Sequence, residues 1–265
     1  MDIVVIIILL IAGFLFGIIS SIVGVGGGIF FVSIMVLLFS ISINVAIDTS
    51  IFIILISSAA GFFTYFKAER LHIKHVLIFS SFSILGGICS TILFLFIELD
   101  STILKILFAS TLLIAGINMI YKAIKSKKYK NTQSEKENDI VDLNEYDYKT
   151  NLKKAIPLFF LAGFIANLLG IGGGVINTPA LHVILQYPIH NATAISVGII
   201  FITAIYNTIA KSIIGQIDYL IGLLIGIGAI SGSILGATIS GKLPKSHLQF
   251  LVAIVLMGLA IRMYF

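Results

Sequence analysis

Charged residues are scarce in this chain of 265 residues: 11% are Asp, Glu, Lys or Arg, whereas 58% are hydrophobic. A soluble domain usually carries about 25% charged residues, and no soluble fold of this length could bury so much apolar surface. The mean hydropathy of +1.13 points the same way. The composition excludes a soluble protein and predicts an all-α polytopic membrane protein that contacts the lipid bilayer.

A single cysteine, Cys89, excludes a disulfide framework within the chain. The signatures of several enzymes are also missing. The sequence has no H-E-x-x-H, no G-x-S-x-G and no pair of carboxylates within its apolar segments, and neither glycine-rich stretch continues as a nucleotide-binding loop. No cluster of metal-ligating residues is present. We therefore expect no enzymatic activity, no cofactor and no bound metal.

The positive charge is concentrated in one polar stretch. Nine of the 17 Lys and Arg residues lie between 122 and 154 together with six acidic residues, so this stretch has a net charge of 9 − 6 = +3. Lysines beside membrane segments follow the positive-inside rule, and the acidic residues argue against a nucleic-acid partner. We predict a first transmembrane repeat (residues 1–121), a partly disordered cytoplasmic linker (122–154) and a second transmembrane repeat (155–265).

The N-terminal segment has neither the basic start nor the cleavage site of a signal peptide. We expect it to stay in the chain as a membrane segment, and we expect the protein to lie in the inner (cytoplasmic) membrane.

The two halves of the chain repeat. A shift of 146 positions places "SIVGVGGGIFFVSIMVLLF" on "NLLGIGGGVINTPALHVIL". The aligned pairs include small residues as well as aliphatic ones: Gly17 with Gly163, Ala46 with Ala192, Ser50 with Ser196, and Gly86 with Gly232. An internal repeat of about four hydrophobic segments is typical of secondary transporters and channels.

The charges of the loops predict that the repeats are inverted. The basic loop 67–75, the linker and the basic loop 241–247 are expected on the cytoplasmic side, whereas the acidic loop 97–102 is expected outside. The loops 97–102 and 241–247 are equivalent in the repeat, so the two halves should have opposite orientations. A stripe of glycines at Gly228, Gly232 and Gly236 predicts a packing face, either between the repeats or between the protomers of a homodimer.

The most informative stretches are "GVGGG" at 24–28 and "GIGGG" at 170–174. The segment 28–40 that follows the first is about 20 Å long as a helix, too short to cross about 30 Å of hydrocarbon. Each repeat should therefore begin with a hairpin that the glycines break and that continues as a half-helix. Glycines leave successive N–H groups open at a helix N-terminus, where an anion is favoured. The alternative is that they only allow helices to cross closely, in which case alanine at the middle glycine would be tolerated.

Polar residues within the apolar segments complete the candidate site for a small anion. Asp48 is a candidate for a coupling proton, although we expect the dipole at the start of its helix to stabilise it. Lys211 follows one helical turn after Asn207 and is expected to extend to the membrane interface, with attraction of anions in a vestibule as the alternative. The candidate substrate-binding residues are Gly26, Gly27, Gly28, Gly172, Gly173, Gly174, Asn177, Thr178, Thr49, Ser50, Ser196 and Asn207.

The doubled G-x-G-G-G motif, "NTPAL" after the second copy, "IVGVGGGIFFVSI" around the first and "GQIDYLIGLLIGIGAISGSILGATISGKLP" resemble the TauE/SafE family of sulfite exporters. The resemblance covers nearly the whole chain except the linker. It implies export or exchange of sulfite, sulfonates, thiosulfate or related small anions. The family's Thr-Ser pair is present at Thr49 and Ser50, but Ile195 replaces the threonine in the second half, which predicts a more apolar wall there.

These observations together predict a secondary transporter that exports a small, sulfur-containing anion. A proton-coupled importer and an anion channel are the alternatives.

Overall fold

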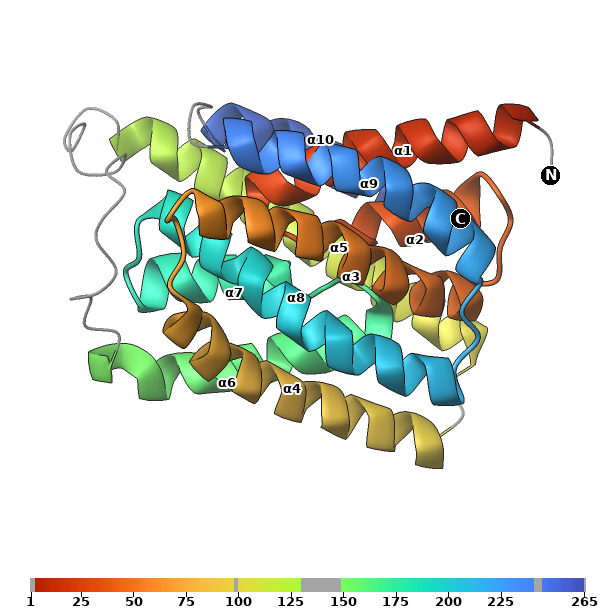
Figure 1. The fold of residues 1–265 in the computed structure, drawn as a ribbon, viewed down its shortest axis with the longest axis horizontal. Coiled ribbons are helices and arrows are strands. Elements are labelled where there is room, and N and C mark those ends of the chain that lie inside the picture. Colours follow the sequence, from red (N-terminus) through yellow and green to blue (C-terminus); the bar gives the residue numbers. More distant parts are fainter. Residues whose placement is uncertain (1–2, 98–99, 130–148, 241–244, 265) are drawn as a thin grey trace.

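The computed structural model describes residues 3–97, 100–129, 149–240 and 245–264, and the regular structure of these residues is entirely helical (Figure 1). Six of the helices are long and apolar enough to cross a membrane, which confirms the all-α polytopic membrane fold. The elements are α1 (Ile3–Val23), α2 (Gly28–Leu37), α3 (Ile43–Lys67), α4 (Ile73–Phe96), α5 (Ser101–Tyr129), α6 (Lys149–Leu169), α7 (Gly174–Pro179), the π-helical turn η1 (Ala180–Ile184), α8 (Ile189–Ile214), α9 (Tyr219–Ile239) and α10 (Lys245–Tyr264).

The boundaries follow the apolar segments of the sequence closely. Regular structure also reaches into the predicted linker from both sides, because α5 continues to Tyr129 and α6 begins at Lys149. The middle of the predicted linker, 130–148, lies outside the described residues.

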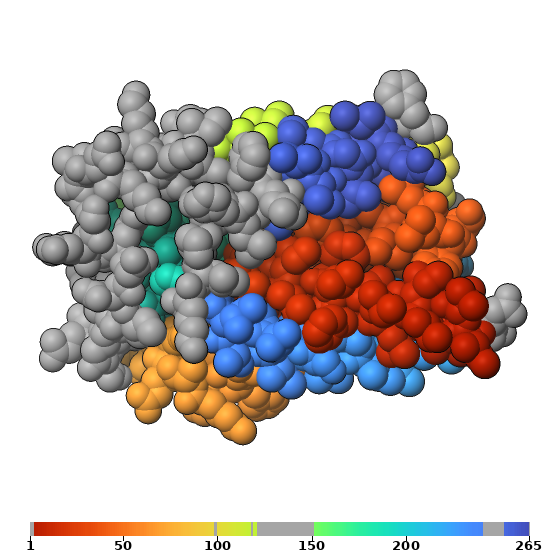
Figure 2. Space-filling view, turned by 90° about the horizontal axis from the view of Figure 1, so that it is seen from above, coloured from red at the N-terminus to blue at the C-terminus, as the bar shows by residue number. Residues whose placement is uncertain are grey.

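The first helix of each half packs against a helix of the other half. Helix α1 lies along α9, and α6 lies along α4. Figure 2 shows α1 in red beside α9 in light blue on one face of the bundle. The last helices of the two halves, α5 and α10, also pack against each other. The two halves are therefore intertwined and share one body of packed helices.

The glycine stripe on α9 forms the contact with α1. The side-chain positions of Gly228, Gly232 and Gly236 face the backbone carbonyls of Leu10, Phe14 and Ile18, so the two helices run in the same direction. Glycine permits this close approach because it has no Cβ atom. The stripe therefore packs between the repeats, which was one of the two alternatives that the sequence left open.

Helices α1 and α6 begin at opposite ends of the bundle (Figure 1). Helix α1 is parallel to α9, α6 is parallel to α4, and the pairs Asp48–Lys211 and Gly61–Val197 show that α3 and α8 are antiparallel. This is the geometry expected of two inverted repeats. Which ends of the helices face the cytoplasm stays a prediction.

Both half-helices are short. Helix α2 has 10 residues, and α7 has 6 residues before the chain changes to the π-helical turn η1. Pro179 ends α7, and its missing N–H group removes a regular helical hydrogen bond at this point.

Two glycine-to-alanine substitutions test how tightly α1 packs on α9. A methyl group at Gly232 would overlap the carbonyl of Phe14, whereas a methyl group at Gly258 on α10 would meet nothing within 4 Å. We expect Gly232→Ala to destabilise the protein by about 1–3 kcal/mol, and Gly258→Ala to leave its stability unchanged or raise it by up to about 1 kcal/mol. The measurement is the melting temperature in detergent, and equal values for the two variants would contradict the packing described here.

Candidate functional site

The two glycine tracts, Gly24–Gly28 and Gly170–Gly174, have the same backbone conformation. In the first, Gly24, Gly26 and Gly27 have φ angles of +73°, +96° and +72°. At the equivalent positions of the second tract the angles are +66°, +81° and +75°. Residues with a side chain rarely adopt these angles. The sequence repeat is thus also a repeat of local structure.

The tracts cross each other in direct backbone contact. A Cβ atom at Gly26 would lie 3.3 Å from the Cα of Gly172, and a Cβ atom at Gly172 would lie 3.3 Å from the Cα of Gly26. A Cβ atom at Gly28 would overlap the carbonyl oxygen of Gly170, and one at Gly174 would overlap that of Gly24. No side chain fits between the tracts where they cross.

Hydroxyl groups hold the carbonyl oxygens beside the crossing. The hydroxyl group of Ser50 lies 2.7 Å from the carbonyl oxygens of both Gly170 and Ile47 and shares its single hydrogen between them. Its repeat counterpart Ser196 donates a hydrogen bond of 2.9 Å to the carbonyl of Gly24, which also accepts a bond of 3.1 Å from Thr178. All three side chains are buried. Three of the predicted ligand residues therefore hold the tracts in place in this structure.

Each half-helix leaves its first N–H groups free of hydrogen bonds within the described part of the chain. Gly27 and Gly173 precede α2 and α7, and the first bonds to their carbonyls come from the N–H groups of Phe30 at 2.9 Å and Ile176 at 3.1 Å. The free N–H groups are those of Gly28 and Ile29 in α2 and of Gly174 and Val175 in α7. They lie at the helix N-termini, where the helix dipole is positive. Both ends meet near the crossing.

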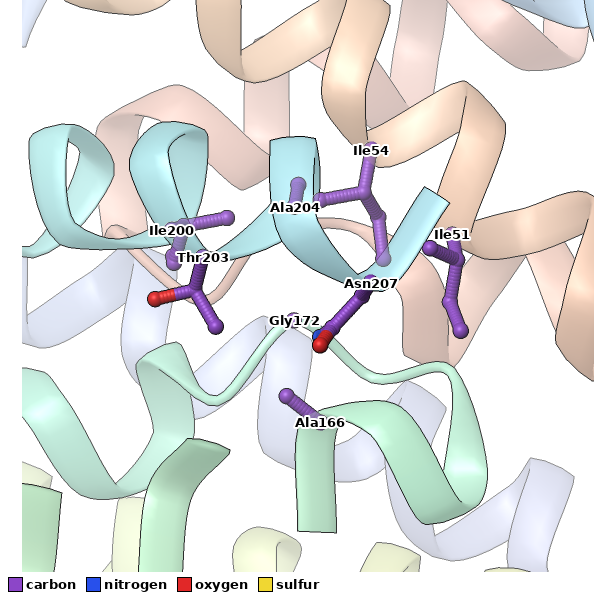
Figure 3. A pocket seen from close by; sticks show the side chains of 8 residues that line it. All are labelled: Ile51, Ile54, Ala166, Gly172, Ile200, Thr203, Ala204 and Asn207. Carbon is purple, nitrogen blue, oxygen red and sulfur yellow. The ribbon is translucent and has the colours of Figure 1, made fainter. Parts of the chain in front are cut away.

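A small cavity lies beside the crossing (Figure 3). Its volume is about 10 Å³, measured to the centre of a water-sized sphere, which is room for about one water molecule. Thr203 and Asn207 contribute its polar groups from α8, and their oxygens are buried without a hydrogen-bond partner among the described residues. The cavity is lined by Ile51, Ile54, Ala166, Gly172, Ile200, Thr203, Ala204 and Asn207.

Gly172 and Asn207 are the predicted site residues that reach this cavity. Thr49 lies elsewhere and accepts a hydrogen bond of 2.9 Å from the N–H group of Asp218. Asn177 is buried, and its side-chain oxygen has no partner in the described residues. Thr203 was not among the predicted site residues. It lies one helical turn before Asn207 on α8, and this spacing could have indicated that the two side chains share a helix face.

The expectations for Asp48 and Lys211 are wrong. Asp48 lies in the second turn of α3, beyond the strongest influence of the helix dipole. Lys211 is buried rather than extended to the interface. The Lys211 Nζ atom lies 2.8 Å from Asp48 Oδ1, the side chains are only 4% and 8% exposed, and the lysine also lies over the ring of Phe94 at 3.7 Å.

The ion pair lies at the inner wall of a vestibule of about 720 Å³. The vestibule is formed by the start of α3, the end of α4, the start of α5 and the end of α8. Its lining residues are Asn44, Ile47, Asp48, Phe94, Leu95, Ile97, Asp100, Ser101, Leu104, Lys211, Ile214, Gly215 and Gln216.

Comparison with known proteins identifies the family. The sequence profile described as "Sulfite exporter TauE/SafE" matches residues 9–263. The chain belongs to the TauE/SafE family. It is 31% identical to the probable membrane transporter protein MJ0441 of Methanocaldococcus jannaschii, over 95% of this chain and 93% of that protein. It is 27% identical to the probable membrane transporter protein YunE of Bacillus subtilis, over 94% of both chains.

The probable membrane transporter protein YdhB of Bacillus subtilis is 26% identical over 89% of this chain and 91% of that protein. No solved structure gives a significant match. The TauE/SafE family and these relatives, together with the six apolar helices, establish a multi-pass membrane transporter.

The conformation of the tracts also corrects the expectation that alanine would be tolerated if the glycines only broke a helix. Gly27 and Gly173 both have positive φ angles, and a Cβ atom at Gly27 would lie 2.8 Å from the ring of Phe31. Alanine is therefore strained at both positions whether or not an anion binds there.

The serine bonds at the crossing predict an order of stabilities. Among the described residues the carbonyl of Gly170 accepts a bond from one hydroxyl group, that of Ser50, whereas the carbonyl of Gly24 accepts bonds from Ser196 and Thr178. Ser50→Ala should therefore cost about 1–3 kcal/mol, because it leaves a buried carbonyl without this partner. Ser196→Ala should cost less. Melting temperatures in detergent test the order.

The matched control is Ser196→Ala combined with Thr178→Val, which removes both donors from Gly24. This double variant should be about as unstable as Ser50→Ala. A Ser196→Ala variant that alone is less stable than Ser50→Ala would contradict this account of the crossing.

Proposed function

We propose that this TauE/SafE protein is a secondary transporter of the cytoplasmic membrane that exports a small, sulfur-containing anion such as sulfite or a short sulfonate. The observation that carries the proposal is the meeting of two half-helix N-termini beside a small cavity that contains the polar groups of Thr203 and Asn207. Backbone N–H groups that lack other partners and the positive ends of two helix dipoles favour an anion at this place. Transporters commonly bind their substrates between broken helices near the middle of the bilayer.

The cavity is too small for such a substrate, so we interpret this conformation as closed. In this proposal the ion pair between Asp48 and Lys211 closes the path toward the vestibule. On the other side, Tyr65 donates a hydrogen bond of 2.7 Å to the carbonyl of Ser21. Passage requires the cavity to expand and these contacts to open. A carrier that opens in turn to the two sides fits this arrangement better than a channel does.

Export of an anion needs no chemical energy source in this proposal. An inside-negative potential of 100 mV contributes about 2.3 kcal/mol per charge toward the outside, or about fiftyfold in the equilibrium concentration ratio of a monovalent anion. A proton-coupled importer would instead use a titrating group, for which Asp48 is the candidate within the membrane segments. In this structure the carboxylate is paired with Lys211, so the pair would have to open before Asp48 could bind a proton.

The test is transport by the purified protein in liposomes loaded with sulfite. Efflux should accelerate when an imposed potassium potential makes the interior negative. It should be unaffected by a pH gradient when both pH values lie well above the second pKa of sulfite, so that its charge is the same on the two sides. Unlabelled sulfite on the far side should stimulate uptake of labelled sulfite, as a carrier requires. Efflux without such stimulation would indicate a channel, and dependence on the pH gradient alone would indicate proton coupling.

The cavity wall yields a prediction for one residue. Asn207→Asp places a negative charge beside Gly172, where the proposed anion binds. Repulsion between the two negative charges should reduce the rate of sulfite transport by about tenfold or more. Asn207→Ser keeps a neutral polar group and should retain most of the activity. Equal transport by the two variants at equal melting temperature would place the anion elsewhere.

A further inference from the structure

We propose that Lys211 binds the transported anion between the cavity and the vestibule, and that Asp48 is the counter-ion that the anion displaces. The inference rests on the proposed function, because it assumes that an anion passes the crossing. It assigns a binding role to the lysine and a competing role, rather than proton transfer, to the carboxylate.

The position of Lys211 is the first argument. Thr203, Asn207 and Lys211 follow one another at intervals of four residues on α8 and therefore share one face of the helix. The first two line the small cavity, and the third lines the vestibule. An anion that moves along this face of α8 leaves the cavity at Asn207 and reaches Lys211 one helical turn later.

The surroundings of the ammonium group are the second argument. A lysine has three N–H donors, and the structure gives Lys211 one acceptor among the described residues, Asp48 Oδ1 at 2.8 Å. The ring of Phe94 lies 3.7 Å from the Nζ atom, where a cation is attracted to the face of the ring. The phenylalanine ring can stabilise the positive charge while the ammonium turns from the carboxylate to an anion.

The carboxylate is held more firmly than the lysine. Asp48 Oδ2 accepts a hydrogen bond of 2.8 Å from the N–H group of Gln216, and the next residue, Thr49, accepts one from Asp218. The start of α3 is thus bonded at two adjacent residues to the link between α8 and α9. Because Lys211 carries the charge on a flexible chain of four carbons, the lysine is the partner that moves when the pair opens.

The repeat supplies a third argument. The residues equivalent to Asp48 and Lys211 are Ala194 and Tyr65. Tyr65 is buried and donates its hydrogen bond to the carbonyl of Ser21. The fold therefore fills the same two positions with neutral residues in the other half. A buried ion pair is seldom more stabilising than well-packed neutral residues, so packing alone does not account for this one.

The test compares Asp48→Asn, Lys211→Met and the double variant that combines them. Binding is measured from the rise in melting temperature with added sulfite, with sulfate as a second oxyanion probe, and transport is measured in liposomes. The Asp48→Asn substitution frees the ammonium group of Lys211. This variant should bind sulfite about tenfold more tightly than the unmodified protein, which is the effect expected of one hydrogen bond to a charged group. Lys211→Met should lose this binding. The double variant should be as stable as the unmodified protein but transport at least about tenfold more slowly, for the same lost bond.

The matched control is Asp100→Asn. Asp100 lines the same vestibule, and its substitution removes the same charge without freeing Lys211. Its sulfite affinity should change less than twofold, on the scale of a screened surface charge. An equal gain in affinity in both single Asn variants, or normal transport by the double variant, would overturn the proposal and leave the ion pair with a structural role.

Failure of the proposed function gives a different result. If the unmodified protein transports no sulfite, the proposed substrate is wrong. The binding measurements still decide the role of Lys211, because Asp48→Asn should then bind sulfite or sulfate in a way that Lys211→Met abolishes. Absence of such binding would overturn the inference as well.

Discussion

The contact between two glycine tracts at the centre of the bundle determines most of this structure. A Cβ atom at Gly28 would overlap the carbonyl of Gly170, and one at Gly174 would overlap that of Gly24. Since no side chain fits there, the tracts approach until their backbones touch. Helices α1 and α6 must end at the crossing, and α2 and α7 must begin there. The breaks between α1 and α2 and between α6 and α7, and the position of the cavity, follow from this contact.

A broken backbone is costly inside a membrane, because no water is available to satisfy its polar groups. This protein satisfies the acceptors and leaves the donors open. The carbonyls of Gly24 and Gly170 receive hydrogen bonds from buried hydroxyl groups, whereas N–H groups at the starts of α2 and α7 receive no acceptor from the described residues. The proposal of an anion at the crossing rests on this imbalance, which arises from the positions of Ser50 and Ser196 as much as from the glycines.

The sequence predicted the features that depend on local pattern and composition. The apolar segments gave the helices, and the glycines and their spacing gave the breaks, the short half-helices and the repeat. It did not predict contacts between distant segments. Ser50 and Ser196 were expected to bind the substrate, yet they bind backbone carbonyls of the opposite tract, a choice that depends on how the tracts cross. The ion pair of Asp48 and Lys211 was missed because the repeat gave no hint of it: the equivalent residues, Ala194 and Tyr65, cannot form one.

That difference between the halves bears on the direction of transport. If two inverted repeats were identical, the states open to either side would be equal in energy, and the scaffold would favour neither. Here one end of the path has a buried ion pair beside a vestibule, and the equivalent position at the other end has a tyrosine bonded to a backbone carbonyl. In the proposed mechanism an anion replaces the carboxylate at Lys211, whereas the residue at the equivalent position, Tyr65, has a neutral hydroxyl group. In the proposed mechanism the shared fold allows both openings, and the few residues that break its symmetry determine which opening an anion stabilises.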